Sequence, residues 1–433
     1  MHLQVAGASP CNVSMLPELI AIHPPAVPPV TSVVIPGSKS LTNRALILAA
    51  LSSGTVTLKG ALASEDTEVM TDCLTRLGFA LTIEPDPDEA ANRTITVEGK
   101  GGVIPNGGTP AEPLQLYVGN AGTAARFLSA LLCLGNGSYR LSGVPRMHER
   151  PQSALFAALR QLGYHIETPN DRLPAVVHGT GPRPGAVCSV SVVESSQFAS
   201  ALLLAAGCGE WDVNVTGANP DELPYVEMTR AQIKAFPFHG GTCVIEPDAS
   251  SATYFWGADW LLRPAGGEIT VSGAPASGWQ IDGNFFRLTQ NPWPARCSRS
   301  TDLADGIMTA IAMAPFAPLP SLFTDLGRLR LQECERVAAL KSELTKCGAV
   351  VTESGNTLAI QPGPLRAARI ATYHDHRIAM CFAILGLRVP GMEIEDPGCV
   401  RKTFPNFFAK LSDCGAIIQD ASGHQLSGTN LLA

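Results

Sequence analysis

Short segments that combine glycine, hydroxyl and basic side chains recur along the chain, in a pattern that suits the binding of small anions. The first covers residues 36–44 and offers Lys39, Ser40 and Arg44 beside a predicted helix start. Backbone N–H groups are free at such a start and the helix dipole is positive there, so an anion is stabilised. The GxxxxGK[ST] spacing of a Walker A loop is missing. A capped helix start that faces solvent would explain the same residues.

Two further segments repeat this combination. Residues 119–126 carry two glycines, including Gly122, and lead into a helix-like run, so a ligand could approach the backbone closely. Residues 145–151 carry Arg146 and Arg150 before a proline that can open a helix. The planar fork of arginine suits contacts with carboxylate or phosphate. An ordinary surface ion pair with Glu149 would explain the second segment almost as well.

Polar residues gather again in later segments, at residues 194–197, 246–251, 302–305, 328–336, 374–377 and 401–405. All these segments together supply candidate cations for one pocket: Lys39, Arg44, Arg126, Arg150, Arg336, Arg377 and Lys402. Asp305 and Glu333 are the candidate acid–base groups. An enzyme that handles small, multiply charged anions without a metal needs this combination of residues.

Metal and nucleophile chemistry fit the residues less well. His374 and His376 are two positions apart with no third ligand nearby, which disfavours a metal pair. No two of the 12 cysteines form a CxxC pair, which argues against a zinc ribbon or finger. No nucleophile elbow supports a Ser–His–Asp arrangement. We therefore expect no metal site.

The composition predicts a globular chain of two domains. Its 433 residues exceed one ordinary core, and its 45% of hydrophobic residues excludes disorder as the main state. The net charge of −7 argues against a general nucleic-acid binder. No apolar run is long enough to span a membrane, and residues 1–29 lack the pattern of a signal peptide. With cysteines that are expected to be free thiols, these features predict a cytoplasmic protein.

One local pattern recurs, in which a helix-like segment ends near Leu-Gly or Cys-Gly and a β-like run follows. The copies cover residues 72–84, 158–167, 230–246, 343–352 and 409–419, with a degenerate sixth at 284–290. Glycine after a helix suits a left-handed C-cap, and β-branched residues then begin a strand. Three copies precede residue 250 and three follow it, which predicts two similar α/β domains. Ordinary alternation of helices and strands, without true repeats, is the other interpretation.

Taken in order, the polar segments resemble those of the enolpyruvyl transferase family, and within it the 5-enolpyruvylshikimate-3-phosphate (EPSP) synthases. The matching stretches run from about residue 36 to residue 408 and read PGSKSLTNRA, GNAGTAARFL, RMHERP, ESSQFASALLLAA, EPDASSATY, DGIMT, ECERV, YHDHRIAM and RKTFPNFF. The resemblance implies an α/β fold of two similar domains, each with three βαβαββ repeats in an inside-out, barrel-like arrangement, and a hinge between them. It places residues 1–36 and 247–433 in one domain and residues 37–246 in the other.

The resemblance also implies an activity. EPSP synthases transfer the enolpyruvyl group of phosphoenolpyruvate to the 5-hydroxyl of shikimate-3-phosphate and release phosphate, by addition followed by elimination. The reaction belongs to the shikimate pathway of aromatic amino acid and chorismate biosynthesis, and glyphosate is expected to compete with phosphoenolpyruvate. No metal or organic cofactor is expected. The implied partners are the two small-molecule substrates, with no nucleic acid and no membrane, and the chain is expected to be a monomer.

Carried over residue by residue, the family motifs assign roles to side chains of this chain. Phosphoenolpyruvate would be surrounded by Lys39, Gly122, Arg150, Gln197, Arg336, His376, Arg377 and Lys402. The acceptor would be held by Ser40, Arg44, Ser195, Ser196, Gln197, Tyr225 and Asp305. Asp305 would take the proton of the acceptor hydroxyl, and Glu333 with Lys39 would handle proton transfer at the methylene carbon.

Three positions depart from the family pattern, all at the acceptor. Glu222 stands where the family usually has serine, and Arg328 and Gln332 stand where it has asparagine and lysine. A glutamate beside a bound phosphate would be repulsive by roughly a few kcal/mol if poorly screened. Arg328 could offset that charge, or Glu222 could point away. The donor side of the site is therefore the safer part of the inference.

Two other functions fit parts of the same evidence. One is enolpyruvyl transfer to a different alcohol, such as the sugar of a nucleotide. The UDP-N-acetylglucosamine enolpyruvyl transferases carry a cysteine on a mobile loop, and the corresponding stretch here leads to RMHERP without one. The other is a non-catalytic anion-binding homologue, for which Asp305 and Glu333 would be unnecessary.

Overall fold

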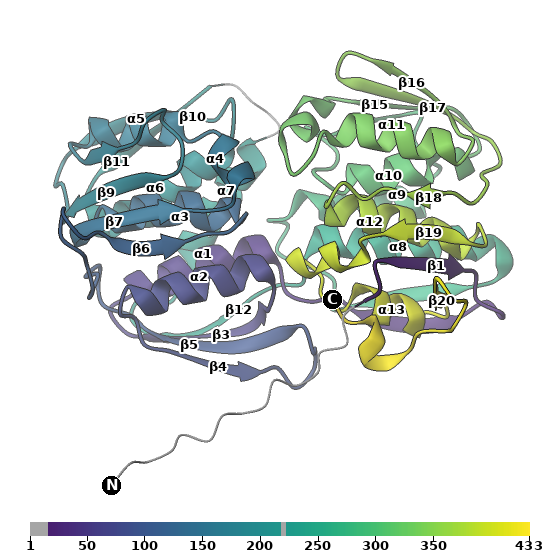
Figure 1. The fold of residues 1–433 in the computed structure, drawn as a ribbon, viewed down its shortest axis with the longest axis horizontal. Coiled ribbons are helices and arrows are strands. Elements are labelled where there is room, and N and C mark those ends of the chain that lie inside the picture. The colour runs from purple at the N-terminus through teal and green to yellow at the C-terminus, as the bar shows by residue number, and fades with distance from the viewer. Residues whose placement is uncertain (1–15, 218–221) are drawn as a thin grey trace, which may run out of the picture.

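The computed structural model describes residues 16–217 and 222–433. These residues form two hydrophobic cores, one drawn from residues 41–245 and the other from residues 16–35 and 252–431. Figure 1 shows the corresponding two lobes side by side. We call residues 37–246 the first lobe and the rest of the described chain the second lobe. The predicted two-domain α/β architecture is confirmed.

The chain passes between the lobes twice, and the two crossing segments pair with each other. Gly37 and Pro247 form an isolated antiparallel bridge. Beside it, the backbone N–H of Ser38 donates to the carbonyl oxygen of Glu246 at 2.8 Å. We propose that this paired crossing is the expected hinge, and that the domain boundaries lie there, between residues 36 and 37 and between residues 246 and 247.

Helices that are buried on nearly all sides occupy the inside of both lobes. Those of the first lobe are α1 (Lys39–Leu51), α3 (Gly122–Leu132) and α6 (Ser196–Gly209). Those of the second lobe are α8 (Ala249–Leu262), α10 (Ile307–Met313) and α12 (His376–Ala383). A helix that is apolar all round belongs in a core, because any exposed face would leave apolar surface in water.

The sheets lie outside these helices. In the first lobe one sheet has the order β12 (Gly241–Val244), β3 (Thr55–Leu62), β5 (Asn92–Glu98), β4 (Leu81–Pro85). A second has the order β6 (Leu114–Tyr117), β7 (Asn136–Ser142), β9 (Ala175–Thr180), β8 (His165–Glu167). The strands β10 (Val187–Ser191) and β11 (Asp212–Thr216) form a third, two-stranded sheet.

The second lobe has the same set of sheets. One has the order β18 (Arg369–Ile370), β19 (Met392–Glu395), β1 (Leu19–His23), β20 (Ile417–Asp420). Another has the order β14 (Arg296–Ser298), β15 (Ser321–Thr324), β17 (Thr357–Gln361), β16 (Val350–Ser354). The two-stranded sheet pairs β13 (Glu268–Ser272) with β2 (Val30–Val34).

The strand pairing shows that the units are true repeats. In each four-stranded sheet the first pair is parallel and the next two pairs are antiparallel. The same sequence of pairings recurs in both sheets of the second lobe. In the described residues the third sheet of each lobe keeps only its parallel pair. In the described residues each lobe thus has two four-stranded sheets and one two-stranded sheet, and none of these sheets closes into a barrel.

Outer helices lead into edge strands, as the recurring pattern predicts. They are α2 (Glu65–Arg76), α5 (Ser153–Gln161), α7 (Leu223–Ala235), α9 (Phe285–Gln290), α11 (Arg336–Lys346) and α13 (Phe407–Asp413). The glycines that follow α2, α5, α11 and α13 have φ angles of +88° to +94°, a backbone conformation that glycine adopts without strain. Short elements near the cleft are α4 (Pro145–Glu149) and the 3-10 helices η4 (Leu326–Leu331) and η6 (Pro397–Lys402).

The described residues also bear on the expectations about cysteines and membranes. Their cysteines are free, and Cys73, Cys133 and Cys381 are fully buried in the two cores. Cys11 lies outside the described residues. No helix in residues 16–217 and 222–433 combines the length and hydropathy of a membrane span.

Candidate active site

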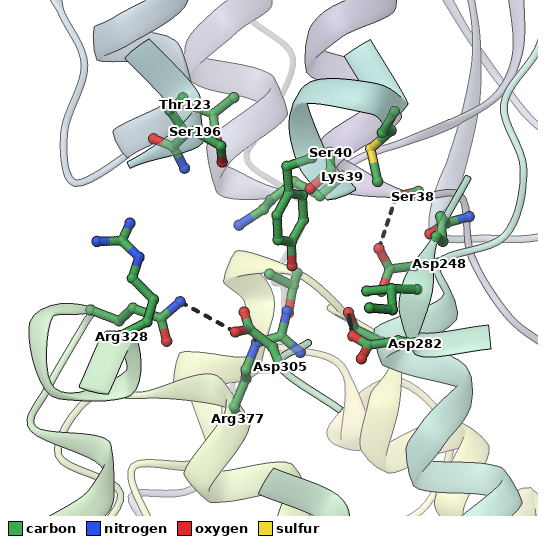
Figure 2. Close-up of a pocket in the computed structure, with 18 of the residues that line it drawn as sticks. Ser38, Lys39, Ser40, Thr123, Ser196, Asp248, Asp282, Asp305, Arg328 and Arg377 are labelled. Carbon is green, nitrogen blue, oxygen red and sulfur yellow. Dashed lines mark hydrogen bonds and ion pairs between the residues drawn. The ribbon is translucent and has the colours of Figure 1, made fainter. Parts of the chain in front are cut away.

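A cavity of about 1050 Å³, its open mouth included, lies where the two lobes face each other. Its lining comes largely from the first turns of the buried helices and from the segments just before them. The lining residues are Ser38, Lys39, Ser40, Arg44, Thr123, Arg150, Ser196, Gln197, Glu222, Tyr225, Met228, Asp248, Ser250, Gln280, Ile281, Asp282, Arg299, Asp305, Arg328, Gln332, Glu333, His376, Arg377 and Thr403. In Figure 2, Lys39, Ser40, Thr123 and Ser196 of the first lobe face Arg328, Asp305 and Arg377 of the second.

The helix starts around the cavity differ in whether a side chain caps them. Ser195, Asp248 and Asp375 each accept a hydrogen bond from a first-turn backbone N–H of α6, α8 and α12. The starts of α1 and α3 have no such cap, so their first N–H groups are available to an anion. The capped, solvent-facing start that was the other interpretation of residues 36–44 is therefore wrong.

Glu333 is held between two cations of the second lobe. Its carboxylate lies 2.9 Å from Nη2 of Arg336 and 3.2 Å from Nζ of Lys402. Burial raises the pKa of the Glu333 carboxyl, but Arg336 and Lys402 outweigh burial and hold this pKa well below its usual value. Glu333 is therefore ionised at neutral pH. Arg336 and Lys402 stand behind it and do not themselves line the cavity.

Asp305 lies at the centre of a second group of charges. Its carboxylate is 3.2 Å from Nε of Arg377, 3.2 Å from Nη2 of Arg299 and 3.2 Å from the side-chain amide of Gln332. Burial raises the pKa of Asp305, but Arg377, Arg336 and Arg299 together lower it far below the usual range. The charged form of Asp305 thus contributes stability above the unfolded carboxyl pKa, and this contribution is lost as the pH falls toward its folded pKa.

Arg336 and Asp375 form the most deeply buried ion pair of the site. Asp375 accepts hydrogen bonds from Nε of Arg336 at 2.6 Å and from its Nη2 at 3.1 Å, and both side chains are at most 1% exposed. Burial lowers the pKa of Arg336, but Asp375, Glu333 and Asp305 raise it above its usual value. The two hydrogen bonds to Asp375 fix the orientation of the guanidinium, and the same guanidinium also contacts the Glu333 carboxylate.

Arg150 differs from the other arginines of the site because its guanidinium is available to a ligand. Its guanidinium donates to the carbonyl oxygen of Asn120 at 3.1 Å, and no carboxylate of the described residues pairs with it. Burial lowers the pKa of Arg150, while Glu333 opposes that shift. A Cβ atom on Gly122 would lie 2.6 Å from Nη2 of Arg150, so any larger residue there would push this guanidinium aside. Glu149 forms its ion pair with Arg146 and not with Arg150, at a distance of 2.6 Å on the surface.

His376 presents unused hydrogen-bonding atoms to the cavity. The ring is 1% exposed, and neither ring nitrogen has a hydrogen-bond partner in the described part of the chain. Burial and then Arg377 lower the pKa of His376 well below its usual value, so the imidazole is neutral. Buried polar atoms are nearly always paired, and a bound ligand would supply the missing partner. His374 is remote from this function, since it is exposed and paired with Asp396 at 2.6 Å.

The acceptor-side residues form a group around the start of α6. Nε of Arg328 lies 2.9 Å from Oε1 of Glu222, and the backbone N–H of Ser196 donates to Oε2 of Glu222 at 2.5 Å. Glu222 therefore points into the site, and Arg328 offsets its charge from the opposite lobe. Arg328 also donates to the carbonyl oxygen of Glu194 and to the hydroxyl of Ser195. One ion pair thus joins the two lobes across the cleft.

Arg44 and Tyr225 are two further cavity-lining residues of the first lobe. Arg44 donates to the hydroxyl of Thr229 at 2.7 Å and to the carbonyl oxygen of Ser40 at 2.9 Å. Burial lowers the pKa of Arg44 to about 10, which leaves it charged at neutral pH. Burial and then Asp305 raise the pKa of Tyr225 well above its usual value, so its hydroxyl stays a neutral donor.

The structure adds residues that the sequence reasoning missed, and it leaves five that were named outside the cavity lining: Gly122, Arg126, Ser195, Arg336 and Lys402. Arg126 does not line the cavity, because its guanidinium is taken up by the carbonyl oxygens of Gly122 and Pro151. Arg299 and Asp282 do line it. Arg299 stands only six residues before Asp305, which was a usable signal. Asp282 lies in a segment without any pattern of its own, and only the fold brings it to the site.

Comparisons with known proteins agree with this geometry. The family model described as "EPSP synthase (3-phosphoshikimate 1-carboxyvinyltransferase)" matches residues 28–239 and 295–411. The 3-phosphoshikimate 1-carboxyvinyltransferase of Nostoc punctiforme is 37% identical, over 88% of this chain and 95% of its own length. That of Rhizobium leguminosarum is 35% identical, over 93% of this chain and 98% of its own length. The structure of the EPSP synthase from Acinetobacter baumannii is 19% identical, with a TM-score of 0.72 over 93% of this chain and all of that one.

The buried pair of Asp375 and Arg336 generates a stability prediction. Changing Asp375→Ala leaves the Arg336 guanidinium buried with less compensation and removes the cap of α12, and we expect a loss of about 3–5 kcal/mol in the free energy of unfolding. Asp72→Ala, which removes an exposed partner of Arg76, is the control and should cost about 0.5 kcal/mol or less. Urea unfolding followed by circular dichroism measures both. Equal losses in the two variants would contradict the role given to Asp375.

Proposed function

This chain belongs to the EPSP synthase family, and from that premise we propose how its cleft performs the family's reaction. The protein is a transferase that moves the enolpyruvyl group of phosphoenolpyruvate to the 5-hydroxyl of shikimate-3-phosphate and releases phosphate. The curated relatives carry the name of this reaction, so transfer to another alcohol is not favoured. What remains to be assigned is the work of each side chain.

The observation that carries the proposal is the gathering of unpaired donors on one side of the cavity. Arg150 lacks a carboxylate partner in the described chain, both ring nitrogens of His376 lack hydrogen-bond partners there, and the start of α3 lacks a cap. Phosphoenolpyruvate carries close to three negative charges, and these groups would bind them. We place the donor there, with Lys39 and Arg377 completing the cage from opposite lobes.

The other residues on the donor side would shape the cavity or hold a neighbouring group in place. Gly122 keeps the space beside Arg150 open, and Gln197 lies in the first turn of α6 at the cavity wall. Arg336 and Lys402 are behind Glu333, so they would bind the donor only at its edge and chiefly hold the carboxylate. Such fixed charges stabilise the departing phosphate without having to reorganise during the reaction.

Glu333 is placed to transfer the proton at the methylene carbon, and Lys39 to assist it. Nζ of Lys39 lies 3.1 Å from the carboxylate of Asp66, at the wall of the cavity. Protonation of the methylene carbon lets the acceptor oxygen add to the neighbouring carbon and form the tetrahedral intermediate. Removal of a proton from the resulting methyl group, with loss of phosphate, then completes the transfer. Because the Glu333 carboxylate starts ionised, Lys39 would supply the first proton and Glu333 would take the second one from the methyl group. Return of that proton from Glu333 to Lys39 would restore both groups.

Asp305 is placed to take the proton of the acceptor hydroxyl. In the described residues it is surrounded by arginines that make its carboxylate a weak base. Substrate anions that pair with Arg377 and Arg299 would withdraw this cationic field and raise the pKa of Asp305. The base would therefore become effective only when the donor and acceptor are both bound.

We propose that the acceptor lies between Asp305 and the start of α6, with Ser40, Arg44, Ser195, Ser196, Gln197 and Tyr225 around it. Its phosphate would lie near Arg328, which reaches across from the second lobe. Glu222 already occupies Arg328 and the N–H of Ser196. The acceptor phosphate would therefore compete with the Glu222 carboxylate for these two groups. Gln332, which donates to Asp305, would set the position of the base instead of contacting the phosphate.

We also propose that a single chain is the working unit, because one chain supplies both walls of the cavity. Light scattering after size-exclusion chromatography would test this. The cytoplasmic location expected from the sequence stays a prediction. Small-molecule substrates account for the lining without a macromolecular partner.

The direct test of the function is phosphate release from phosphoenolpyruvate by the purified protein, with and without shikimate-3-phosphate. We expect release only when the acceptor is present, at a kcat on the order of 1–100 per second. UDP-N-acetylglucosamine in place of shikimate-3-phosphate is the control acceptor and should give no release. Tight binding of phosphoenolpyruvate without turnover would mean that the acceptor has been assigned wrongly.

The donor site predicts different effects for two neighbouring arginines. Arg150→Ala removes charge-assisted hydrogen bonds to phosphoenolpyruvate, and its KM for phosphoenolpyruvate should rise at least about tenfold. Arg146→Ala, a matched control, removes the exposed pair with Glu149 and a 3.5 Å hydrogen bond to the carbonyl oxygen of Gln332. Neither contact is proposed to touch the donor, so this variant should leave that KM within about twofold of the parent value. Steady-state kinetics at saturating acceptor measures both. Unaltered kinetics in Arg150→Ala would remove Arg150 from the donor site.

The competition between Glu222 and the acceptor phosphate generates a further prediction. Glu222→Gln keeps the shape and an acceptor for Ser196 but removes the negative charge, so the KM for shikimate-3-phosphate should fall by at least about threefold. Arg328→Ala should raise the same KM, and neither change should move the KM for phosphoenolpyruvate more than about twofold. A higher acceptor KM in Glu222→Gln would show instead that Glu222 is needed to hold Arg328 in place.

A further inference from the structure

A second cluster of metal-ligating side chains lies away from the cleft, on the outer sheet that ends in β8. We propose that His165, Glu167 and His178 form a binding site for a divalent transition-metal ion such as Zn²⁺. In the described residues this is the group of His, Cys, Asp and Glu side chains whose ligand atoms all lie within 4.8 Å of one another. The reaction in the cleft does not use this site, so the proposal goes beyond the proposed function.

The strand register places the three side chains on one face of the sheet. His165 and His178 are directly opposite each other in the antiparallel pair of β8 and β9. Glu167 is two residues after His165, and side chains two apart on a strand point to the same side. Because the strands themselves fix these positions, binding an ion requires only side-chain rotations.

The distances are close to those of a metal centre. Oε1 of Glu167 lies 2.9 Å from Nε2 of His178 and 4.0 Å from Nδ1 of His165. Metal–ligand bonds of about 2.0–2.2 Å in a tetrahedral site separate the ligand atoms by about 3.3–3.6 Å. His165 is 71% exposed at its side chain, so it can close the remaining gap by rotating in water. The two imidazole rings are stacked, with centroids 4.9 Å apart and planes inclined by 12°, so they approach the carboxylate side by side.

A hydrogen bond to Ser138 also orients the ring of His178. Its Nδ1 is 2.9 Å from the hydroxyl of Ser138, a residue that is 2% exposed on the neighbouring strand β7. In the structure Nε2–H donates to Glu167 at 2.9 Å, and a bound ion would displace that proton. With Nδ1–H donating to the Ser138 hydroxyl, the Nε2 lone pair would then be free for the ion. Histidine ligands in metal sites are usually fixed by such a hydrogen bond at the other ring nitrogen. The hydrogen bond with Ser138 is therefore a second observation in favour of the site, separate from the distances among the three ligands.

The donor set indicates the class of ion. Two imidazole nitrogens and one carboxylate oxygen suit Zn²⁺, Co²⁺, Ni²⁺ or Cu²⁺, whereas Mg²⁺ and Ca²⁺ prefer sites made of oxygen alone. Three protein ligands leave a position for water. The ion would tie the three-residue edge strand β8 to β9, and it would therefore stabilise the end of this sheet.

The proposal is tested by titrating the full-length, EDTA-treated protein with ZnCl₂ in a calorimeter. We expect one saturable site that weakens at least tenfold in His165→Asn and in Glu167→Gln. His374→Asn is the matched control, because His374 forms an equally exposed pair with a carboxylate, Asp396, but belongs to no such three-ligand group in the described chain. This variant should bind zinc like the parent protein.

Two controls keep the outcome decisive. The melting temperature of each variant without zinc shows that it is folded, and its phosphate-release activity should equal that of the parent, because none of these residues lines the cleft. Zinc binding that is unchanged in His165→Asn and Glu167→Gln would overturn the proposal. So would zinc binding that saturating phosphoenolpyruvate displaces, because the ion would then lie in the cleft, and so would the lack of saturable binding. Each of these results leaves the proposed transferase activity unaffected.

Discussion

The cleft depends on one buried charge, the guanidinium of Arg336, and on how that charge is compensated. Asp375 binds it through two hydrogen bonds while also capping α12, and the same guanidinium holds Glu333 at 2.9 Å. A charge taken out of water is expensive unless it is paired, so these side chains can be arranged in few other ways. The start of α12 and the ionisation of Glu333 both depend on this arrangement. Arg336 also adds to the field at Asp305, where Arg377 contributes most.

The division into two lobes explains why the site lies between them. Each lobe buries its helices inside its sheets, and the helix starts emerge where the lobes face each other (Figures 1 and 2). The first lobe supplies Lys39 and Arg150, and the second supplies Arg377 with both carboxylates. Because neither set is complete alone, the site exists only when the lobes are together. The pair of Glu222 and Arg328 lies on that seam, where the acceptor phosphate is proposed to bind.

The sequence allowed the local features to be predicted and left the long-range ones open. Glycine, hydroxyl and basic residues before an apolar run identified the starts of α1 and α3, and Leu-Gly pairs identified the ends of outer helices, because both signals act within a few residues. The residue types alone did not tell which arginine faces the cavity, and only the family resemblance singled out Arg150. Arg150 does face it, whereas Arg126 and Arg146 have partners elsewhere. The composition of the sheets also depends on pairing between segments far apart in the chain, such as β2 with β13 and β3 with β12.

The central claim is that the cations of the cage bind phosphoenolpyruvate while Glu333 transfers the proton. The measurement that tests it most directly compares Glu333→Gln with the parent protein, by acceptor-dependent phosphate release and by calorimetric binding of phosphoenolpyruvate. We predict that kcat falls at least about a hundredfold, as expected for loss of a general acid–base group, while the Kd for phosphoenolpyruvate changes much less. Near-normal turnover in this variant would contradict the claim.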